Sequence, residues 1–145
     1  MANKQPARYL FDSDVLINYF RKNREAYKLM KLVEADRINA YFSVISETEL
    51  LSGVRNKNER KVIGSFLNLM ERLNVDKTIA VLAGEYRNKY FKSHSLETPD
   101  ALIAATAILN DLTLITENKK HFEMIKDLQV KSTKEALRDT KCSIS

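Results

Sequence analysis

The stretch YLFDSDVLINYF, residues 9–20, places two aspartates and a serine inside an apolar run near the start of the chain. Residues 8–11 are typical of a short buried strand, and residues 15–20 begin a helical pattern. A carboxylate removed from water is costly unless it is paired, hydrogen-bonded or bound to a metal. We therefore expect Asp12 and Asp14 to lie where a strand opens onto a polar site or where a helix is capped.

Further strands and helices alternate along the chain after this first strand. Strands are predicted at residues 39–45, 111–116 and 128–132, and helices at residues 25–36, 47–52, 59–73, 78–91, 99–110 and 134–138. Such alternation is typical of an α/β fold with a mainly parallel sheet, here of four to five strands flanked by helices. The length of the chain, 145 residues, predicts one domain, with a core over about residues 8–131 and a polar tail over residues 132–145.

Composition excludes several classes of protein. No apolar run reaches the length of a membrane span, and residues 1–8 lack the apolar segment of a signal peptide, so we expect a cytoplasmic protein without a membrane partner. Cys142 is the single cysteine, which rules out an intrachain disulfide and a cysteine-based zinc site. The net charge of +5 favours a polyanionic partner only weakly, because the basic residues are also compatible with solvated helix faces.

Polar residues follow the predicted strands and open the helix before the third strand. In parallel α/β sheets, ligand sites gather at the carboxyl ends of the strands. Taken singly, these residues are also typical of helix caps: Ser46 and Glu49 fit a capping box, and Thr98 with Pro99 and Asp100 fits a helix start. The groups are Asp12 and Asp14, then Ser46, Glu47 and Glu49, then Thr98 and Asp100, and finally Thr116 and Asn118.

The combination of acids favours a metal site over separate caps. Asp12, Glu49 and Asp100 can supply oxygen ligands from the ends of three different elements, and Mg²⁺ prefers oxygen ligands. Carboxylates brought so close would repel one another unless a cation neutralised them. We therefore predict a divalent cation at this position.

At these residues the chain resembles the PIN-domain ribonucleases, and most closely the VapC toxins of bacterial and archaeal toxin–antitoxin systems. The resemblance runs from Tyr9 to Phe122 and implies a three-layer PIN-like sandwich. The segments that carry it are YLFDSDVLINYF, FSVISETELLSGV, KSHSLETPDALIAATAI and LTLITENKKHF, in the family's order.

The resemblance implies a role for each matching residue. Asp12, Glu49 and Asp100 match the family's three metal-binding acids, with Asp14, Ser13 and Thr116 in support. Asn118 stands where the family has a fourth acid, which leaves one or two Mg²⁺ or Mn²⁺ ions as alternatives. The activity implied is metal-assisted hydrolysis of RNA phosphodiesters, which inhibits translation.

The resemblance also implies partners, namely an RNA substrate, a VapB-type antitoxin and a second copy of the chain. The antitoxin groove is expected among the apolar residues of the first two helices. Phosphate contacts are assigned to three basic residues near the site segments. The groove residues are Ile17, Tyr19, Phe20, Tyr27 and Met30, and the phosphate contacts are Arg55, Lys119 and Lys120.

Three alternatives to a toxin stay open at this point. Asn118 is compatible with a PIN-fold RNA-binding or scaffold protein whose catalysis is weakened. A PIN nuclease of RNA processing, outside toxin–antitoxin systems, would carry the same acids. The sequence DSDVL, residues 12–16, also fits the start of a haloacid-dehalogenase-type phosphatase, in which Asp12 would be a nucleophile.

Overall fold

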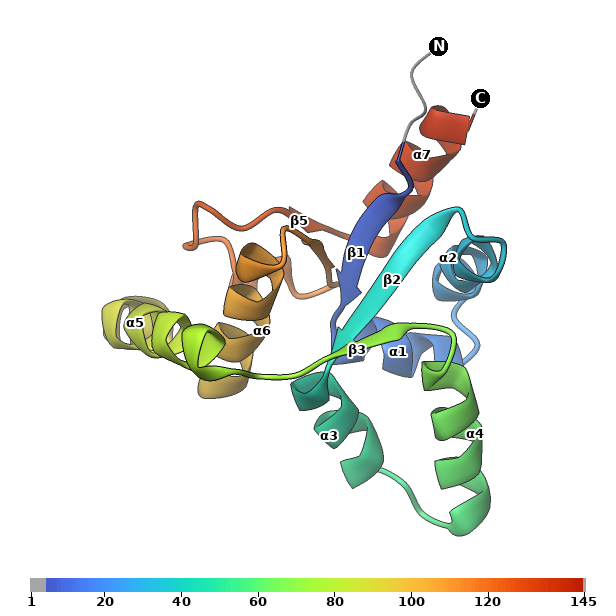
Figure 1. The fold of residues 1–145 in the computed structure, drawn as a ribbon, viewed down its shortest axis with the longest axis horizontal. Coiled ribbons are helices and arrows are strands. Elements are labelled where there is room, and N and C mark those ends of the chain that lie inside the picture. The colour runs from blue at the N-terminus through green and yellow to red at the C-terminus, as the bar shows by residue number, and fades with distance from the viewer. Residues whose placement is uncertain (1–4, 145) are drawn as a thin grey trace.

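The central strand of the sheet comes from the beginning of the chain, and its neighbours come from distant parts of the sequence (Figure 1). The computed structural model describes the backbone of residues 5–144 and the side chains of residues 5–140. Within that range five strands form one parallel sheet in the order β3-β2-β1-β4-β5, which confirms the predicted α/β class. The strands are β1 (Ala7–Phe11), β2 (Ile38–Ser43), β3 (Glu71–Leu73), β4 (Thr113–Ile115) and β5 (Val130–Lys131).

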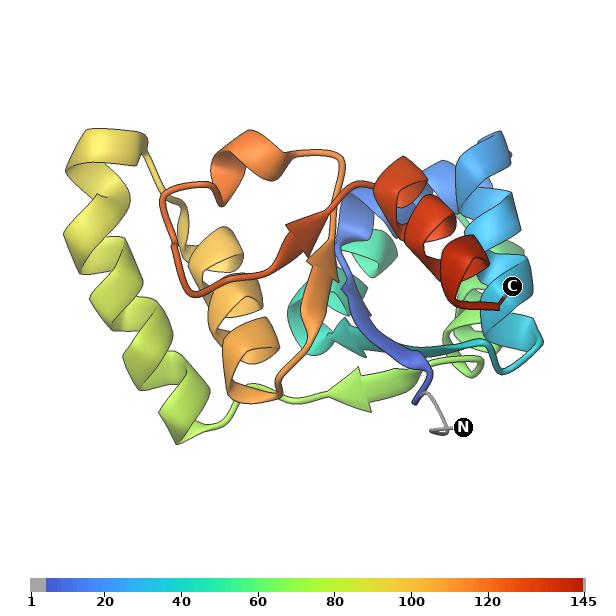
Figure 2. The same ribbon diagram turned by 90° about the horizontal axis from the view of Figure 1, so that it is seen from above.

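Helices cover both faces of the sheet and make three layers (Figure 2). One face packs against α1 (Ser13–Phe20), α2 (Arg24–Glu34), α4 (Lys57–Leu67) and α7 (Thr133–Ile144). The opposite face packs against α5 (Lys77–His94) and α6 (Thr98–Leu109). Helix α3 (Val44–Ser52) follows the carboxyl end of β2, and the short 3₁₀ turn η1 (Lys119–His121) follows β4.

Alternation along β1 explains why the protein has two apolar cores. Tyr9 and Phe11 join the core under α1, α2 and α7, whereas Leu10 joins the core under α5 and α6. Successive side chains of a strand point to opposite faces, so a central strand covered on both sides must be apolar throughout. This accounts for the uninterrupted apolar run before Asp12.

The strand order reverses between β1 and β4. From β1 the chain builds β2 and β3 on one side, and it later places β4 and β5 on the other. Ligands of open parallel sheets bind outside the carboxyl ends of the strands at such a reversal. The backbone N–H of Asp12 donates to the carbonyl oxygen of Ile115 at 3.0 Å, which holds the ends of β1 and β4 together at this point.

Several predicted elements have different bounds in the structure. The helix expected over residues 59–73 ends at Leu67, and residues 71–73 form β3 instead, because they pair with β2 at the sheet edge. The strand expected over residues 39–45 ends at Ser43, whose hydroxyl accepts from the backbone N–H of Ile45 at 3.0 Å and starts α3. Pairing and capping thus override the local helical and β preferences.

The expected polar tail over residues 132–145 is helical from Thr133 to Ile144. Ala136 and Leu137 are buried against the core that contains α1 and α2, so the core extends beyond residue 131. Among residues 133–140, Thr133, Ala136, Leu137 and Thr140 are buried. The mainly polar composition of α7 is why the sequence suggests a tail. Cys142 lies outside the residues whose side chains are described. Among the described helices, none is long and apolar enough to cross a membrane.

Candidate active site

Asp12 occupies the turn from β1 into α1 and is only 7% exposed. Its Oδ1 accepts a hydrogen bond from the backbone N–H of Ser13 at 2.8 Å, and its Oδ2 accepts from the hydroxyl of Thr116 at 2.9 Å. Asp12 is therefore both the cap of α1 and the buried acid at the end of β1. The two interpretations of residues 9–20 are both correct, because one carboxylate does both.

Asp14 lies in the first turn of α1 and is held by the loop that follows β4. Its Oδ2 accepts from the backbone N–H of Glu117 at 2.8 Å, from the side-chain amide of Asn118 at 3.2 Å and from the Thr116 hydroxyl at 3.2 Å. The backbone N–H of Asn118 in turn donates to the Thr116 oxygen at 3.1 Å. Asp14 thus ties α1 to residues 116–118.

Glu49 and Asp100 reach the same end of the sheet from α3 and α6. The pKa of Glu49 is raised by burial and by the charges of Asp100 and Asp14, while a hydrogen bond from Ser13 acts in the opposite direction. Asp100 lies 3.3 Å from His121, measured between Oδ2 and Nδ1. The predicted acids therefore lie close enough for their charges to raise one another's pKa, and they form one acidic cluster.

Neither Glu49 nor Asp100 caps its helix. Helix α3 begins at Val44 with Ser43 as its cap, so Ser46 lies inside the helix, and the predicted capping box of Ser46 with Glu49 is wrong. Helix α6 begins one residue earlier than predicted, with Glu97 rather than Thr98 at the cap position and without a side-chain cap bond. Because neither carboxylate is used as a helix cap, both are available to a ligand.

The charge of this acidic cluster is not balanced by basic side chains. Burial and then the charge of Asp14 raise the pKa of Asp12 to about 7, although hydrogen bonds from Thr116 and Ser13 favour its ionised form. Burial is likewise the main cause that raises the pKa of Asp14 and of Asp100. Over the described side chains, no lysine or arginine forms an ion pair with any of the four acids.

The donor set fits a hard cation. The groups present are mainly carboxylate and hydroxyl oxygens, which Mg²⁺ and Mn²⁺ prefer, and among the described side chains no lysine or arginine pairs with the four acids. In the part of the chain with described side chains, no three Asp, Glu, His or Cys residues come close enough to hold an ion by themselves. A cation at this cluster would need water or substrate oxygens to complete its coordination, as is usual for Mg²⁺.

Comparisons with known proteins agree with this geometry. The model of the PIN domain matches residues 9–128. The chain belongs to the PIN-domain family. Ribonuclease VapC1 of Methanocaldococcus jannaschii is 30% identical over 129 residues, which are 88% of each chain. Ribonuclease VapC10 of Mycobacterium tuberculosis is 36% identical over 121 residues, covering 83% of this chain and 90% of the relative.

A solved structure extends the comparison to three dimensions. A toxin–antitoxin complex from Klebsiella pneumoniae contains a chain that superposes with a TM-score of 0.71 at 30% identity, covering 86% of this chain and 97% of that one. Together with the two relatives, this likeness places the protein in the VapC ribonuclease branch of the PIN-domain family. The resemblance inferred from the sequence is therefore confirmed.

Two of the three basic residues assigned to RNA in this PIN-domain protein already have acidic partners. Arg55 pairs with Glu59 through both nitrogens of its guanidinium edge, at 3.1 Å from Nε and 2.9 Å from Nη2. Lys119 lies 2.7 Å from Glu135 at the start of α7. Lys120 forms no ion pair with any described residue. Of the three, Lys120 alone has no acidic partner among the described residues, so its charge is free to contact phosphate.

Sequence reasoning misses two links in the site of this PIN-domain protein. His121 lies against Asp100, a contact that the sequence does not indicate. Glu117 accepts a hydrogen bond from the backbone N–H of Thr133 at 3.0 Å and so connects the site loop to α7. The pattern ENKKH, residues 117–121, carries no local signal for either contact, because both partners come from distant elements.

Proposed function

We propose that the protein is a Mg²⁺- or Mn²⁺-dependent endoribonuclease and the toxin of a cytoplasmic toxin–antitoxin pair. PIN-domain nucleases are generally metal-dependent, and the named relatives are ribonucleases. The observation that carries the proposal is Asp12, a buried carboxylate with its pKa raised to about 7 beside other acids. A bound cation would stabilise the ionised forms of these acids, with which no lysine or arginine pairs among the described side chains.

In this proposal Asp12, Glu49 and Asp100 hold one or two ions. When bound, a divalent cation polarises a phosphate and makes a water molecule more acidic. Neighbouring side chains hold these acids in position. The Thr116 hydroxyl holds both Asp12 and Asp14 in place, and His121 holds Asp100.

Ser13 and Asn118 support this arrangement. Ser13 hydrogen bonds to Glu49 and thereby stabilises its ionised form. The amide of Asn118 donates to Asp14, so the structure uses it as a donor rather than as a fourth acid. This use of Asn118 favours one firmly held ion over two.

The proposed antitoxin site is an apolar groove beside the acids. A hollow of about 510 Å³ lies among α1, α3 and α4 and is bordered by Glu49. Through Phe20 and Val62 it continues into a second hollow of about 820 Å³ that Tyr19 and Tyr27 also line. Met30, which the sequence places in this groove, is instead buried in the core.

The shape and chemistry of this groove fit an amphipathic segment. Val62 and Tyr27 are each 50% exposed, so apolar surface remains uncovered along the groove. Such grooves bind the apolar face of a helix. A segment seated there would end beside Glu49 and could block the acidic cluster. The likeness to a chain of a toxin–antitoxin complex supports this partner.

We also propose that two copies of the chain associate through α5 and α6. Val81 and Leu109 are 52% and 44% exposed and line one hollow between these helices. This patch lies on the opposite side of the sheet from the antitoxin groove (Figure 1). Light scattering during gel filtration, at a series of protein concentrations, measures the molar mass of the protein in solution. A monomer at all concentrations would reject the dimer.

The deciding experiment measures cleavage of labelled single-stranded RNA by the purified protein and by its Asp12→Asn variant. Cleavage that requires Mg²⁺ or Mn²⁺, stops in EDTA and is absent in the variant supports the nuclease. RNA binding without cleavage by the parent protein would favour the scaffold alternative. Hydrolysis of a generic phosphate ester in place of RNA would favour the phosphatase.

A further inference from the structure

The last turns of α5 combine cations with aromatic rings. Residues 86–96, YRNKYFKSHSL, contain three basic residues, three aromatic residues and no acid. Lys89 and Lys92 are exposed, and Phe91 is 42% exposed. Ile79 and Ala83, one to two turns earlier, provide the buried face of the helix. We call the group formed by the exposed Lys89, Phe91 and Lys92 and the half-buried Arg87 and Tyr90 the α5 surface.

Two cations of the α5 surface, Arg87 and Lys89, contact rings rather than carboxylates. The Arg87 guanidinium carbon lies 4.1 Å from the centroid of the Phe91 ring, and the Lys89 ammonium lies 5.2 Å from that of Tyr90. Among the residues with described side chains, none forms an ion pair with Arg87, Lys89 or Lys92. Their positive charge therefore remains available to an anionic partner.

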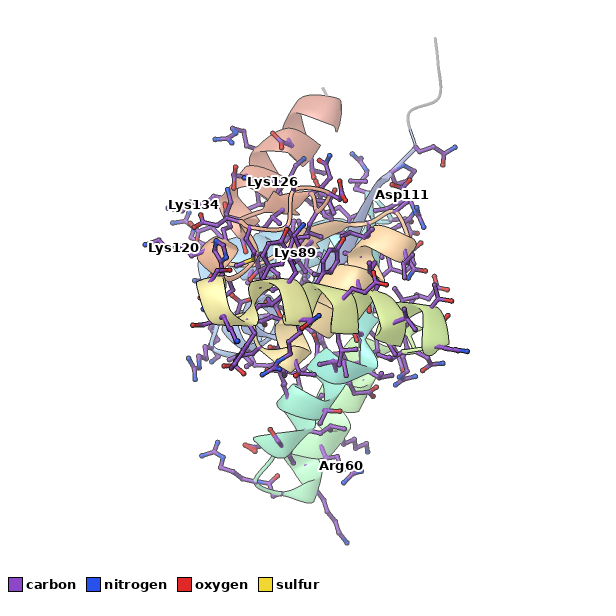
Figure 3. All side chains as sticks on the ribbon, turned by 90° about the vertical axis from the view of Figure 1, so that its left-hand side faces the viewer. Arg60, Lys89, Asp111, Lys120, Lys126 and Lys134 are labelled. Atoms are coloured by element: carbon purple, nitrogen blue, oxygen red, sulfur yellow. The ribbon has the colours of Figure 1, made fainter. Side chains whose placement is uncertain are left out.

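The α5 surface is connected to the acidic cluster through the start of α6. Three residues separate α5 from α6, whose first turn carries Asp100, which contacts His121 of η1. Lys120, the neighbour of His121, is exposed. In Figure 3, Lys89, Lys120 and Lys126 are labelled in the upper part of the molecule, around α5, whereas Arg60 of α4 lies at the lower end.

This surface and the apolar antitoxin groove lie on opposite sides of the sheet. Helix α5 packs on the face covered by α6, whereas α1 and α4, which line the groove, pack on the other face (Figure 1). The groove is lined mainly by apolar side chains, although basic residues such as Arg21 and Arg24 border it, whereas the exposed side chains of the α5 surface are two lysines and one aromatic ring. The two surfaces therefore differ in the partner that they fit, although both lead toward the same acids.

We propose that the α5 surface binds single-stranded RNA and directs it into the acidic cluster. This inference rests on the proposed nuclease function and identifies where its substrate lies. Basic side chains bind the phosphates of any nucleic acid, whereas exposed aromatic rings stack on unpaired bases. A duplex hides its bases, so the combination on α5 selects an unpaired loop or strand.

The test measures RNA binding in the Asp12→Asn background, in which bound RNA is not cut. Fluorescence anisotropy follows a labelled single-stranded oligouridylate over a range of salt concentrations. Lys89→Gln combined with Lys92→Gln should weaken binding by about tenfold and reduce the salt slope by about 0.7 for each phosphate that is no longer neutralised. Phe91→Ala should weaken binding about tenfold and leave that slope unchanged, because it removes stacking.

The matched control removes the same charge elsewhere. Arg60→Gln combined with Lys61→Gln lies on exposed positions of α4 and should leave binding unchanged. Melting curves check that every variant is folded. A hairpin duplex of the same length should bind more weakly than the single strand.

Several results would overturn the inference. These are an absence of RNA binding, equal weakening by the α4 control, or unchanged binding by the α5 variants. Failure of the nuclease proposal is separate, because it appears as an absence of cleavage by the parent protein in Mg²⁺ and Mn²⁺. In that case α5-dependent RNA binding would still establish the surface.

Discussion

The hydroxyl of Thr116 donates a hydrogen bond of 2.9 Å to the carboxylate of Asp12, although 104 positions separate the two residues in sequence. The bond crosses the point where the strand order reverses between β1 and β4. It shows how the end of a late strand holds the first acid. This bond, the acids around it and the apolar groove beside them can each be tested.

Replacing Thr116 tests the bond directly. Thr116→Val removes the donor that Asp12 and Asp14 share, so both carboxylates lose a bond that favours their ionised forms. We expect RNA cleavage to fall by about 10–100-fold, as for other residues that orient metal ligands. Thr116→Ser keeps the hydroxyl and should restore most of the activity. Equal activity in the Val and Ser variants would contradict this role.

Stability of the metal-free protein should depend on pH in a defined direction. Asp12 has a pKa of about 7 in the folded protein against an ordinary 3.8, so the folded state binds its proton more tightly than the unfolded state. Stability is therefore lost as pH rises from about 4 to 7, by up to about 4 kcal/mol. Melting curves in EDTA from pH 4.5 to 8 measure this.

Magnesium should reverse that loss at high pH, because a bound cation favours the ionised acids. Asp12→Asn cannot ionise at this position and should show a smaller decline with pH. A parent protein whose melting temperature is flat over this range, with or without Mg²⁺, would contradict the assignment of Asp12.

Asp12 and Asp14 should be separable in one assay. Asp12→Asn is expected to reduce RNA cleavage to background, since it removes a proposed ligand. Asp14→Asn should leave measurable activity, because Asp14 acts by holding Thr116, Glu117 and Asn118. A loss of about 10–100-fold is typical of such a residue. Complete loss in both variants would instead assign Asp14 as a direct ligand.

Glu49 and Asp100 should not behave as helix caps. A cap replaced by a residue that cannot cap costs about 0.5–2 kcal/mol. Because neither residue caps its helix, Glu49→Gln and Asp100→Asn should keep or raise the melting temperature of the metal-free protein as repulsion is relieved. Both changes should abolish cleavage. Loss of stability with activity retained would restore the cap interpretation.

The antitoxin groove can be tested without touching the acids. Val62 lines both hollows of the groove, so Val62→Lys places a charge where they meet. This variant should not bind an antitoxin, while its RNA cleavage continues. Val81→Lys is the matched control, because Val81 is similarly exposed but lies on α5. It should spare antitoxin binding and disrupt only the proposed dimer. Titration of RNA cleavage with the antitoxin measures antitoxin binding by both variants.

The sequence by itself determined the class of fold and the candidate acids. The apolar run before Asp12 requires a strand buried on both faces, and the alternation of strands and helices requires a parallel sheet. Those features depend on local periodicity, which a single sequence displays. Because ligand sites of parallel sheets gather at the carboxyl ends of the strands, the order of elements alone then places Asp12 near Glu49 and Asp100.

Only the tertiary structure decided how the remaining residues are used. It assigned residues 71–73 to an edge strand, buried Ala136 in the core and made Asn118 a donor to Asp14. It also neutralised Lys119 with an acid from α7 and left the cations of α5 without acidic partners among the described side chains. The physical reason is range: helix and strand periodicity acts over a few neighbouring residues, whereas strand pairing, burial and ion pairs depend on partners that only folding brings together.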